Sequence, residues 1–217
     1  AGDFDATSFE VASSELPVIN LNQDEGGSVG NFSTNAGNVD DLLIPGIPGF
    51  NDSTDGIAAE FLAYVELKGG LNTMGVNSDD GFKVTAGPSP VDQFGTRLGF
   101  FEGGRGAADT IFDFVVEKDG VYPMRLLWFE GRGGANVEWF SVVDGEKILI
   151  NDSENPNASK AYREVTGGSP TYASKVVPAP GATNVDPDPT IEVELTDGAD
   201  PVDTGSVSLS LNGVAVE

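Results

Sequence analysis

The chain has 217 residues, with 11 Lys and Arg against 35 Asp and Glu, a formal net charge of −24 at pH 7, and neither Cys nor His. This charge argues against nucleic acid, anionic membranes and acidic polymers as partners, because binding phosphate needs clustered basic side chains. Without Cys or His there is no disulfide, no thiolate or imidazole metal site and no common catalytic triad. Cations and neutral ligands remain as partners.

Short runs rich in Val, Ile, Phe, Tyr and Thr alternate along the chain with Gly, Asn, Asp and Pro, and this pattern predicts an all-β fold, an antiparallel β-sandwich. The stretch 59–67 also fits a helix, although the surrounding pattern favours a strand. The predicted strands are 8–12, 58–67, 73–76, 82–85, 110–117, 122–129, 136–143, 147–150 and 160–165. Between the first two, residues 22–41 are expected to form an exposed loop and residues 42–49 a buried, irregular connection with two Pro-Gly turns.

Composition changes after residue 166 and divides the chain into a β-sandwich over 1–166, a linker over 167–177 and a partial domain over 178–217. The last part resembles the opening of a bacterial immunoglobulin-like repeat, in its Pro-Gly-Ala-Thr-Asn-Val start and its Leu-Asn-Gly-Val turn. Such a domain needs roughly 100 residues and seven strands. Either a larger parent protein continues the domain, or a neighbouring chain adds strands to it by β-augmentation.

The motif with the most chemical content is Asp79-Asp80-Gly81, which lies between two predicted strands. Adjacent side chains on a regular strand face opposite ways, so both acids reach one ion only if the backbone departs from strand geometry. A cis peptide bond between them would achieve this, and Ca²⁺, which binds six to eight oxygens, would hold it in place. The alternative is a solvated type I turn without a ligand.

Three ordered motifs, Asn77-Ser78-Asp79-Asp80-Gly81-Phe82, the strand Tyr122-Pro123-Met124-Arg125-Leu126-Leu127-Trp128-Phe129-Glu130 and the glycine-rich loop before Trp139, resemble the anthrax protective-antigen (PA-fourteen) domain family. The resemblance covers roughly residues 44–165. It implies a β-sandwich module of the kind found in bacterial toxins, glycosidases and surface proteins and in fungal adhesins.

By this resemblance, Asp79 and Asp80 are ligands of Ca²⁺, joined by a cis bond. Glu130 falls where the adhesins have a further side-chain ligand, an Asn. The carbonyls of the loop that follows, through Arg132 and Gly134, complete the implied set.

The candidates for contact with a sugar are Glu102, Trp128, Arg132, Gly133 and Asn136. Arg132 either donates to a ligand hydroxyl or neutralises Glu130 or Glu102. Trp128, like Trp139, is either a core residue or a stacking wall for a sugar ring. Asp109 and Asp113 are further acids close in sequence to a glycine-rich loop, and as site candidates they rank below the residues named above.

These features predict a non-catalytic, calcium-dependent carbohydrate-binding or adhesion module of a larger secreted or cell-surface bacterial protein, with a carbohydrate or glycoconjugate as partner and no membrane insertion. The alternative is a structural subunit of an extracellular filament or surface layer, assembled by strand exchange through the C-terminal segment. Glycoside hydrolysis by paired carboxylates is a third, weaker reading, because a calcium-bound carboxylate is a poor general acid.

Overall fold

A computed structural model of the protein describes residues 13–23, 30–32, 42–44, 55–166 and 170–216. These residues form fourteen strands and no helix, which confirms the predicted all-β class and settles 59–67 as strand. It follows that no helix in these ranges is long and apolar enough to cross a membrane. The predicted strand 8–12 lies outside the described residues.

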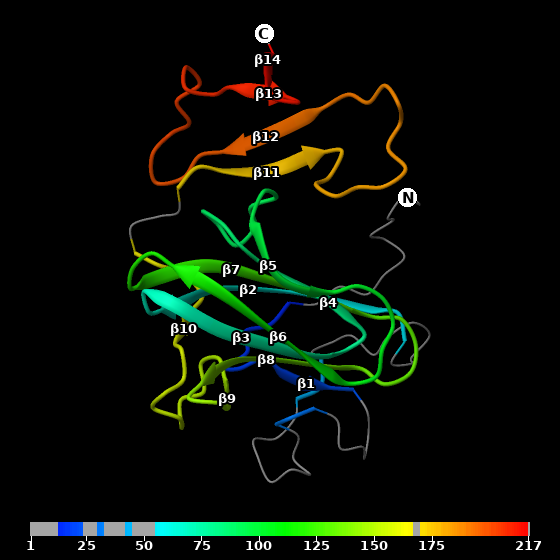
Figure 1. The fold of residues 1–217 in the computed structure, drawn as a ribbon, viewed down its shortest axis with the longest axis vertical. Helices are drawn as coiled ribbons and strands as arrows, with labels where there is room; N and C mark the ends of the chain where they lie inside the picture. Colours follow the sequence, from blue (N-terminus) through cyan, green and yellow to red (C-terminus); the bar gives the residue numbers. More distant parts are fainter. Residues whose placement is uncertain (1–12, 24–29, 33–41, 45–54, 167–169, 217) are drawn as a thin grey trace.

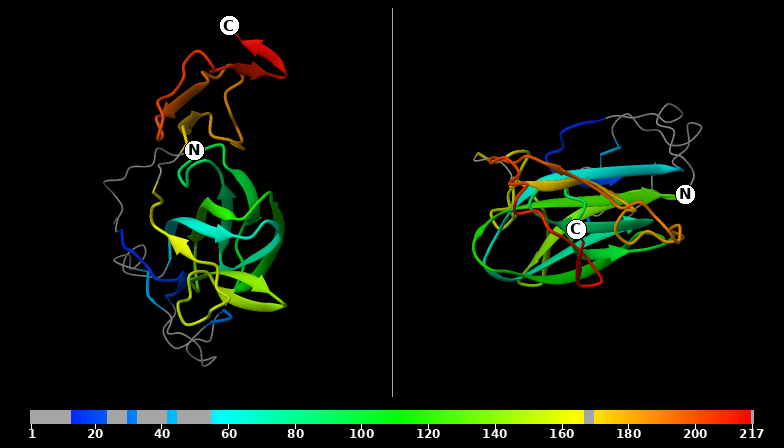
Figure 2. Two further views of the ribbon diagram at one scale, coloured as in Figure 1. Left: turned by 90° about the vertical axis from the view of Figure 1, so that its left-hand side faces the viewer. Right: turned by 90° about the horizontal axis from the view of Figure 1, so that it is seen from above.

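Two antiparallel sheets form the layers of a sandwich (Figure 1). One has the order β1 (Asn20–Asn22), β8 (Asn136–Val143), β3 (Gly70–Asp79) and β6 (Ala108–Val116), with β9 (Glu146–Leu149) also paired to β8. The other has the order β10 (Ala161–Tyr162), β2 (Ile57–Leu67), β7 (Gly120–Glu130), β4 (Gly81–Ala86) and β5 (Thr96–Phe101). Figure 2 shows the two layers from the side, with the C-terminal strands beyond one end.

The core between the layers follows from period-2 alternation. On β7, Met124, Leu126 and Trp128 face inward and are buried, whereas Val121 and Phe129 point outward and are exposed. Trp139 on β8 is also buried, so both tryptophans belong to the core. Each aliphatic side chain buried in this way contributes about 1.5 to 3 kcal/mol relative to its exposed state.

The structure corrects the predicted elements at several points. β1 and β5 were not predicted, and predicted strand 160–165 shortens to the two residues of β10. The prediction of an exposed loop over 22–41 is wrong for the described residues of that range. Asn22 is buried in β1, and residues 30–32 dock against β8. In the predicted buried connection, Ile44 is buried but Leu42 and Leu43 are exposed, and residues 45–49 lie outside the described part.

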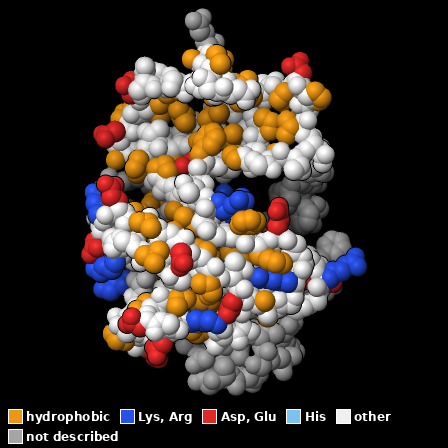
Figure 3. Space-filling model, in the orientation of Figure 1, with side chains coloured by type: hydrophobic (Ala, Val, Ile, Leu, Met, Phe, Trp, Pro, Cys, Tyr) orange, Lys and Arg blue, Asp and Glu red, His pale blue; other side chains and the backbone are white. Residues whose placement is uncertain are grey.

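The C-terminal part forms two small hairpin-like sheets, β11 (Tyr172–Val177) with β12 (Glu192–Thr196), and β13 (Leu209–Leu211) with β14 (Val214–Val216). β11 lies inside the predicted linker 167–177, which is therefore a strand over its second half; its Val176 pairs with Val193 of β12. Apolar side chains of β12, β13 and β14 remain exposed, and Figure 3 shows them as patches on this end of the molecule. Strands β12, β13 and β14 thus leave apolar side chains uncovered, whereas Ala173 of β11 is buried.

Candidate metal centre

The acidic doublet lies where the chain passes from one layer of the sandwich to the other. Asp79 ends β3 and pairs with Asn136 of β8, whereas Gly81 begins β4 and pairs with Phe129 of β7 in the opposite sheet. The peptide bond between Asp79 and Asp80 is cis, the geometry expected from the sequence.

Glu130 completes a cluster with this doublet. It is the last residue of β7, one position beyond the Phe129 that pairs with Gly81. One carboxylate oxygen from each of Asp79, Asp80 and Glu130 lies within 4.8 Å of the other two. The structure therefore brings together the three acids that the sequence suggested as side-chain ligands of a cation.

Main-chain donors from two similar loops hold the carboxylate of Asp80. The backbone N–H of Arg105 donates to its Oδ1 (2.7 Å) and that of Gly131 to its Oδ2 (3.0 Å). These loops follow β5 and β7, the two strands that flank β4 in the sheet, and their sequences, Phe-Glu-Gly-Gly-Arg-Gly-Ala and Phe-Glu-Gly-Arg-Gly-Gly-Ala, echo each other. Each carboxylate oxygen keeps a further lone pair with which to bind a cation.

The side chain of Arg105, which sequence reasoning overlooked, fixes the strand just before the doublet. Its Nε donates to the carbonyl of Ser78 (3.0 Å) and its guanidinium to the Ser78 hydroxyl (2.7 Å) and to Thr110 Oγ1 (2.9 Å). The guanidinium also lies 4.1 Å from the ring centre of Phe101. Burial lowers the pKa of Arg105, although the charges of Asp109 and Asp79 oppose this effect. The only available signal was its place in the loop that echoes 129–135.

Trp128 supports the doublet from the core. It is 2% exposed, and its indole Nε1 donates to the carbonyl of Asp79 (3.1 Å). A ring buried to this degree offers no face to a sugar, so the predicted stacking role of Trp128 is wrong. Trp128 instead positions the backbone of the first acid.

Glu130 is the member of the cluster whose environment most favours a cation. It is 2% exposed, and neither of its carboxylate oxygens meets a hydrogen-bond donor in the described part of the chain. Burial, then the charges of Asp80 and Asp79, raise the pKa of Glu130 from 4.5 to about 8, so that without a cation this carboxyl keeps a proton at neutral pH. A cation in contact with these oxygens would replace that proton.

The loop after Glu130 is anchored to the chain that precedes β2. Gly133 has a φ of +106° and donates its N–H to Asp55 Oδ1 (2.9 Å), while the carbonyl of Gly131 accepts from Gly56 N–H (3.2 Å). Arg132 and Gly134, whose carbonyls were predicted to bind the cation, thus lie in a loop that two hydrogen bonds fix to residues 55 and 56. The carbonyl of Gly131 already accepts one of these hydrogen bonds.

The predicted sugar-contact residues fall into an exposed group and a buried group. Glu102, Arg132 and Gly133 are exposed on the two loops that hold Asp80. Arg132 takes part in none of the ion pairs among the described residues, so the predicted neutralisation of Glu130 or Glu102 is not observed. Asn136 is buried, opposite Asp79.

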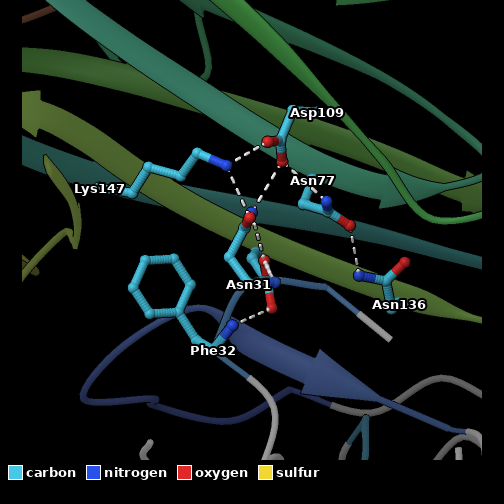
Figure 4. Close-up of polar contacts among 7 residues, drawn as sticks. Asn31, Phe32, Asn77, Asp109, Asn136 and Lys147 are labelled. Carbon is cyan, nitrogen blue, oxygen red and sulfur yellow. Dashed lines mark hydrogen bonds and ion pairs between the residues drawn. The ribbon is translucent and has the colours of Figure 1, made fainter. Parts of the chain in front are cut away.

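A polar network on the outer side of β3 and β8 fixes the amide of Asn136 (Figure 4). Asn136 Nδ2 donates to Asn77 Oδ1 (2.9 Å), and Asn77 Nδ2 donates to Asp109 Oδ1 (2.7 Å). Asp109 also pairs with Lys147 and accepts from Asn31 Nδ2. Burial acts to raise the pKa of Asp109, but the hydrogen bonds from Lys147, Asn31 and Asn77 outweigh it and hold the pKa below its ordinary value. Asp109 is therefore a structural acid rather than a ligand of the cluster.

The same network ties residues 30–32 to β8. Buried Glu138 accepts from the backbone N–H of Asn31 (2.8 Å) and of Phe32 (2.9 Å), and the Phe32 ring lies 5.8 Å from that of Phe140. With Asn136 Nδ2 committed to Asn77, the Asn136 Oδ1 is turned away from this network, and it is buried without a donor from the described residues. Besides the two Glu130 oxygens, Asn136 Oδ1 is therefore a further buried oxygen without a donor from the described residues, on the strand that pairs with Asp79.

No protein-family model matches the chain, and no curated protein matches it. Among solved structures, the chain is similar to a PA14 sugar-binding domain from an RTX adhesin, with 18% identity over 43% of this chain and 50% of that one and a TM-score of 0.36. It is also similar to the epithelial adhesin 9 A domain from Candida glabrata in complex with Galβ1-3GlcNAc, with 13% identity over 69% of this chain and 70% of that one and a TM-score of 0.43. The chain spans about half the length of the first of these structures. At these identities and TM-scores the similarities assign no function to it.

Proposed function

We propose that the chain is a calcium-dependent carbohydrate-binding or adhesion module, with Asp79, Asp80 and Glu130 as the side-chain ligands of Ca²⁺. The observation that carries the proposal is the pair of buried Glu130 oxygens that have no donor within the described chain, placed beside two further carboxylates. Burying an ionised carboxylate without a partner costs several kcal/mol, so such a group either keeps a proton or meets a cation.

The donor set fits Ca²⁺ in kind and in charge. All three side chains offer oxygen, which Ca²⁺ binds at about 2.3 to 2.6 Å with six to eight ligands in flexible geometry. Three ionised carboxylates would carry three negative charges, so a divalent ion leaves one negative charge uncompensated. When bound, Ca²⁺ supplies coordination positions that sugar hydroxyls are able to occupy. We assign as further ligands the carbonyls of Arg132 and Gly134, in the loop that follows Glu130, and the Oδ1 of Asn136, the residue that pairs with Asp79.

The rim of the cluster is suited to neutral, hydroxyl-rich ligands. Glu102 and Arg132 are exposed on the two loops that hold Asp80 and offer an acceptor and a donor for hydroxyl groups. We assign Glu102, Arg132 and Gly133 to sugar contact and leave Trp128 out of it. A cell-surface or extracellular location follows from this role, since adhesion requires access to glycoconjugates outside the cell.

Isothermal titration with CaCl₂ tests the metal, and glycan-array binding with and without EGTA tests the sugar. We expect heat from the intact chain, loss of that heat in Asp80→Ala, and unchanged binding in Glu164→Gln, which removes an exposed acid away from the cluster. Glycan binding should disappear in EGTA and in Asp80→Ala together. Absence of heat from the intact chain would refute the proposal, and glycan binding that persists in EGTA would refute the calcium dependence.

We further propose that the module is not an enzyme. A glycosidase of the two-carboxylate type needs a protonated acid that reaches the glycosidic oxygen of its substrate. Glu130 carries the raised pKa, but it is buried and its oxygens do not reach solvent. Incubation with fluorogenic glycosides, with Glu130→Gln as control, tests this point; turnover that Glu130→Gln abolishes would overturn it.

A role in assembly is a second candidate, favoured by the exposed apolar side chains of the C-terminal strands. Val193 and Leu195 of β12, Ile191 just before it, and Leu209 and Leu211 of β13 are all exposed by more than a third. In this reading, strands from a second copy or from a longer parent chain cover these faces. Light scattering of the chain at rising concentration tests it, with Val193→Ser/Leu195→Ser as the variant: a monomer at every concentration contradicts self-assembly.

A further inference from the structure

A cavity separate from the acidic cluster lies on the outer face of the β10-β2-β7-β4-β5 sheet. It encloses about 360 Å³, within the roughly 300 to 1,000 Å³ of typical small-molecule sites. Outward-pointing side chains of β4, β5 and β7 line one side of it, and residues 179–181, which follow β11, line the other. Figure 3 shows Lys and Arg side chains beside the hollow between the sandwich and the C-terminal strands.

This cavity gathers positive charge in a chain whose net charge is −24. Three of the 11 basic residues line it, Lys83, Arg97 and Arg125. Arg125 pairs with Glu60 at 2.5 Å. Lys83 and Arg97 take part in none of the ion pairs found among the described residues, and the guanidinium of Arg97 lies 3.9 Å from the ring centre of Phe100. Two cations therefore face the cavity without a carboxylate in salt-bridge contact, which favours an anionic ligand.

The other lining groups specify more than charge. Thr85 and Gln93 offer hydroxyl and amide groups, and Asp92, the one acid in the lining, is fixed by accepting from Phe94 N–H (3.0 Å). Leu127 and Pro180 provide apolar surface. A ligand with a carboxylate at one end, hydroxyl groups around a ring and a partly apolar ring face satisfies all of these at once.

We propose that this cavity is a calcium-independent binding site for an acidic saccharide, a sugar residue that carries a carboxylate. Lys83 and Arg97 bind the carboxylate, and Arg125, which also pairs with Glu60, is a third basic group beside them. Thr85, Asp92 and Gln93 form hydrogen bonds with the hydroxyl groups of the sugar. The site deepens the proposed carbohydrate recognition but does not depend on the metal. Thr85 lies five residues beyond Asp80 along β4, which at about 3.3 Å per residue places the two sites roughly 16 Å apart.

Strand pairing and a hydrogen bond fix several of the residues that line the cavity. The loop that contributes Asp92 and Gln93 is tied to β11, because Gln93 N–H donates to the carbonyl of Ala173 (2.9 Å), and Ala173 is buried. On the other side, Thr85 pairs with Arg125 and with Arg97 across the sheet, so three lining residues share one row of the ladder. Thr85, Arg97 and Arg125 are therefore held by strands, and the loop of Asp92 and Gln93 is anchored to β11.

The test is a titration of the full chain, in EGTA, with digalacturonate, with its dimethyl ester and with acetate, followed by the NMR signals of arginine Nε–H groups and by calorimetry. We expect digalacturonate to bind, the ester and acetate to bind at least roughly tenfold more weakly, and Arg97→Gln and Lys83→Gln each to weaken digalacturonate binding by roughly tenfold. Lys118→Gln, which removes an exposed lysine outside the lining, should bind as the parent chain does.

Several outcomes overturn the proposal. They are no binding of digalacturonate, equal binding of the ester, equal binding of acetate, or unchanged binding in both Lys83→Gln and Arg97→Gln when these variants melt at the parent temperature. Digalacturonate binding that appears only with CaCl₂ and disappears in Asp80→Ala would place the sugar at the acidic cluster, which refutes this site and leaves the proposed function intact. Conversely, failure of the calcium titration leaves this site untouched.

Discussion

Replacing Glu130 with Gln should make the metal-free protein more stable at pH 8 and remove its response to calcium. The reason is electrostatic: in the absence of a cation, an ionised Glu130 is buried beside Asp79 and Asp80 with no donor from the described residues. Glutamine has nearly the same shape, carries no charge, and offers an N–H₂ group that the neighbouring carboxylates are able to accept.

The magnitude follows from linkage. The pKa of Glu130 is about 8 in the fold against an ordinary 4.5, so between these values the native state holds a proton that the unfolded chain has lost, and stability falls as pH rises. At 1.36 kcal/mol per pH unit, the upper limit of the loss is about 5 kcal/mol, reached above pH 8. Relaxation and water penetration reduce it, and we expect about 2 to 3 kcal/mol. Below pH 4.5 the effect is absent.

Urea denaturation in EGTA at pH 5, 6, 7 and 8 measures this. Wild-type stability should fall across the series while Glu130→Gln stays level, and the control Glu164→Gln should follow the wild type. Asp109 and Asp119 have lowered pKa values and titrate below this pH range, whereas Lys68, Lys175 and Tyr162 have raised pKa values and titrate above it. A wild-type protein equally stable at pH 5 and pH 8 would refute the reasoning.

Three further predictions concern the metal, its support and the docked segment. Calcium binding at pH 7 should release close to one proton to the buffer, and almost none at pH 9, because Glu130 must lose its proton to bind the ion. Titration in two buffers of different ionisation enthalpy measures this. Arg105→Gln should weaken calcium binding roughly tenfold by releasing Ser78, as calorimetry would show. Gly30→Ala should cost about 2 to 3 kcal/mol in urea denaturation, because its φ is +82° and a Cβ there would lie 2.1 Å from Glu138 Oε1.

Each of these three predictions has a matched control. Proton release equal at pH 7 and pH 9 would contradict the first prediction. Arg132→Gln leaves Ser78 and Asp80 untouched, so a calcium affinity that falls equally in Arg132→Gln and Arg105→Gln would contradict the second. Gly145 has nearly the same φ, +84°, but open space around it, so Gly145→Ala should cost about 1 kcal/mol, and an equal cost at Gly30 would contradict the third.

The sequence predicted strands well where alternation is long and apolar, and poorly where other residues interrupt it. β7 and β8 carry enough regularly spaced apolar side chains to be recognised. β5 was missed because Gly99 interrupts its pattern, and the structure gives the reason: the ring of Phe112 packs where a Cβ would be, within 2.2 Å of its position. β1 has three residues, two of them Asn, and exists because β8 offers it an edge.

For the candidate site, the sequence located the three acids but not what holds them. Asp79 and Asp80 stand out as adjacent acids between two predicted strands, and Glu130 was assigned through the resemblance to the protective-antigen domain family. Arg105 and Trp128 act through contacts between distant strands, with the carbonyl groups of Ser78 and Asp79, and no local pattern encodes such contacts. A Trp in alternation is equally consistent with a core position and a ligand wall until its neighbours are known.

Two backbone N–H groups, those of residues 105 and 131, hold the carboxylate of Asp80. Every residue type except proline supplies such a group at these positions. Substitution at exposed positions 102 and 132 therefore leaves the carboxylate anchored. A laboratory library randomised at these two positions should yield new ligand preferences on an undamaged scaffold.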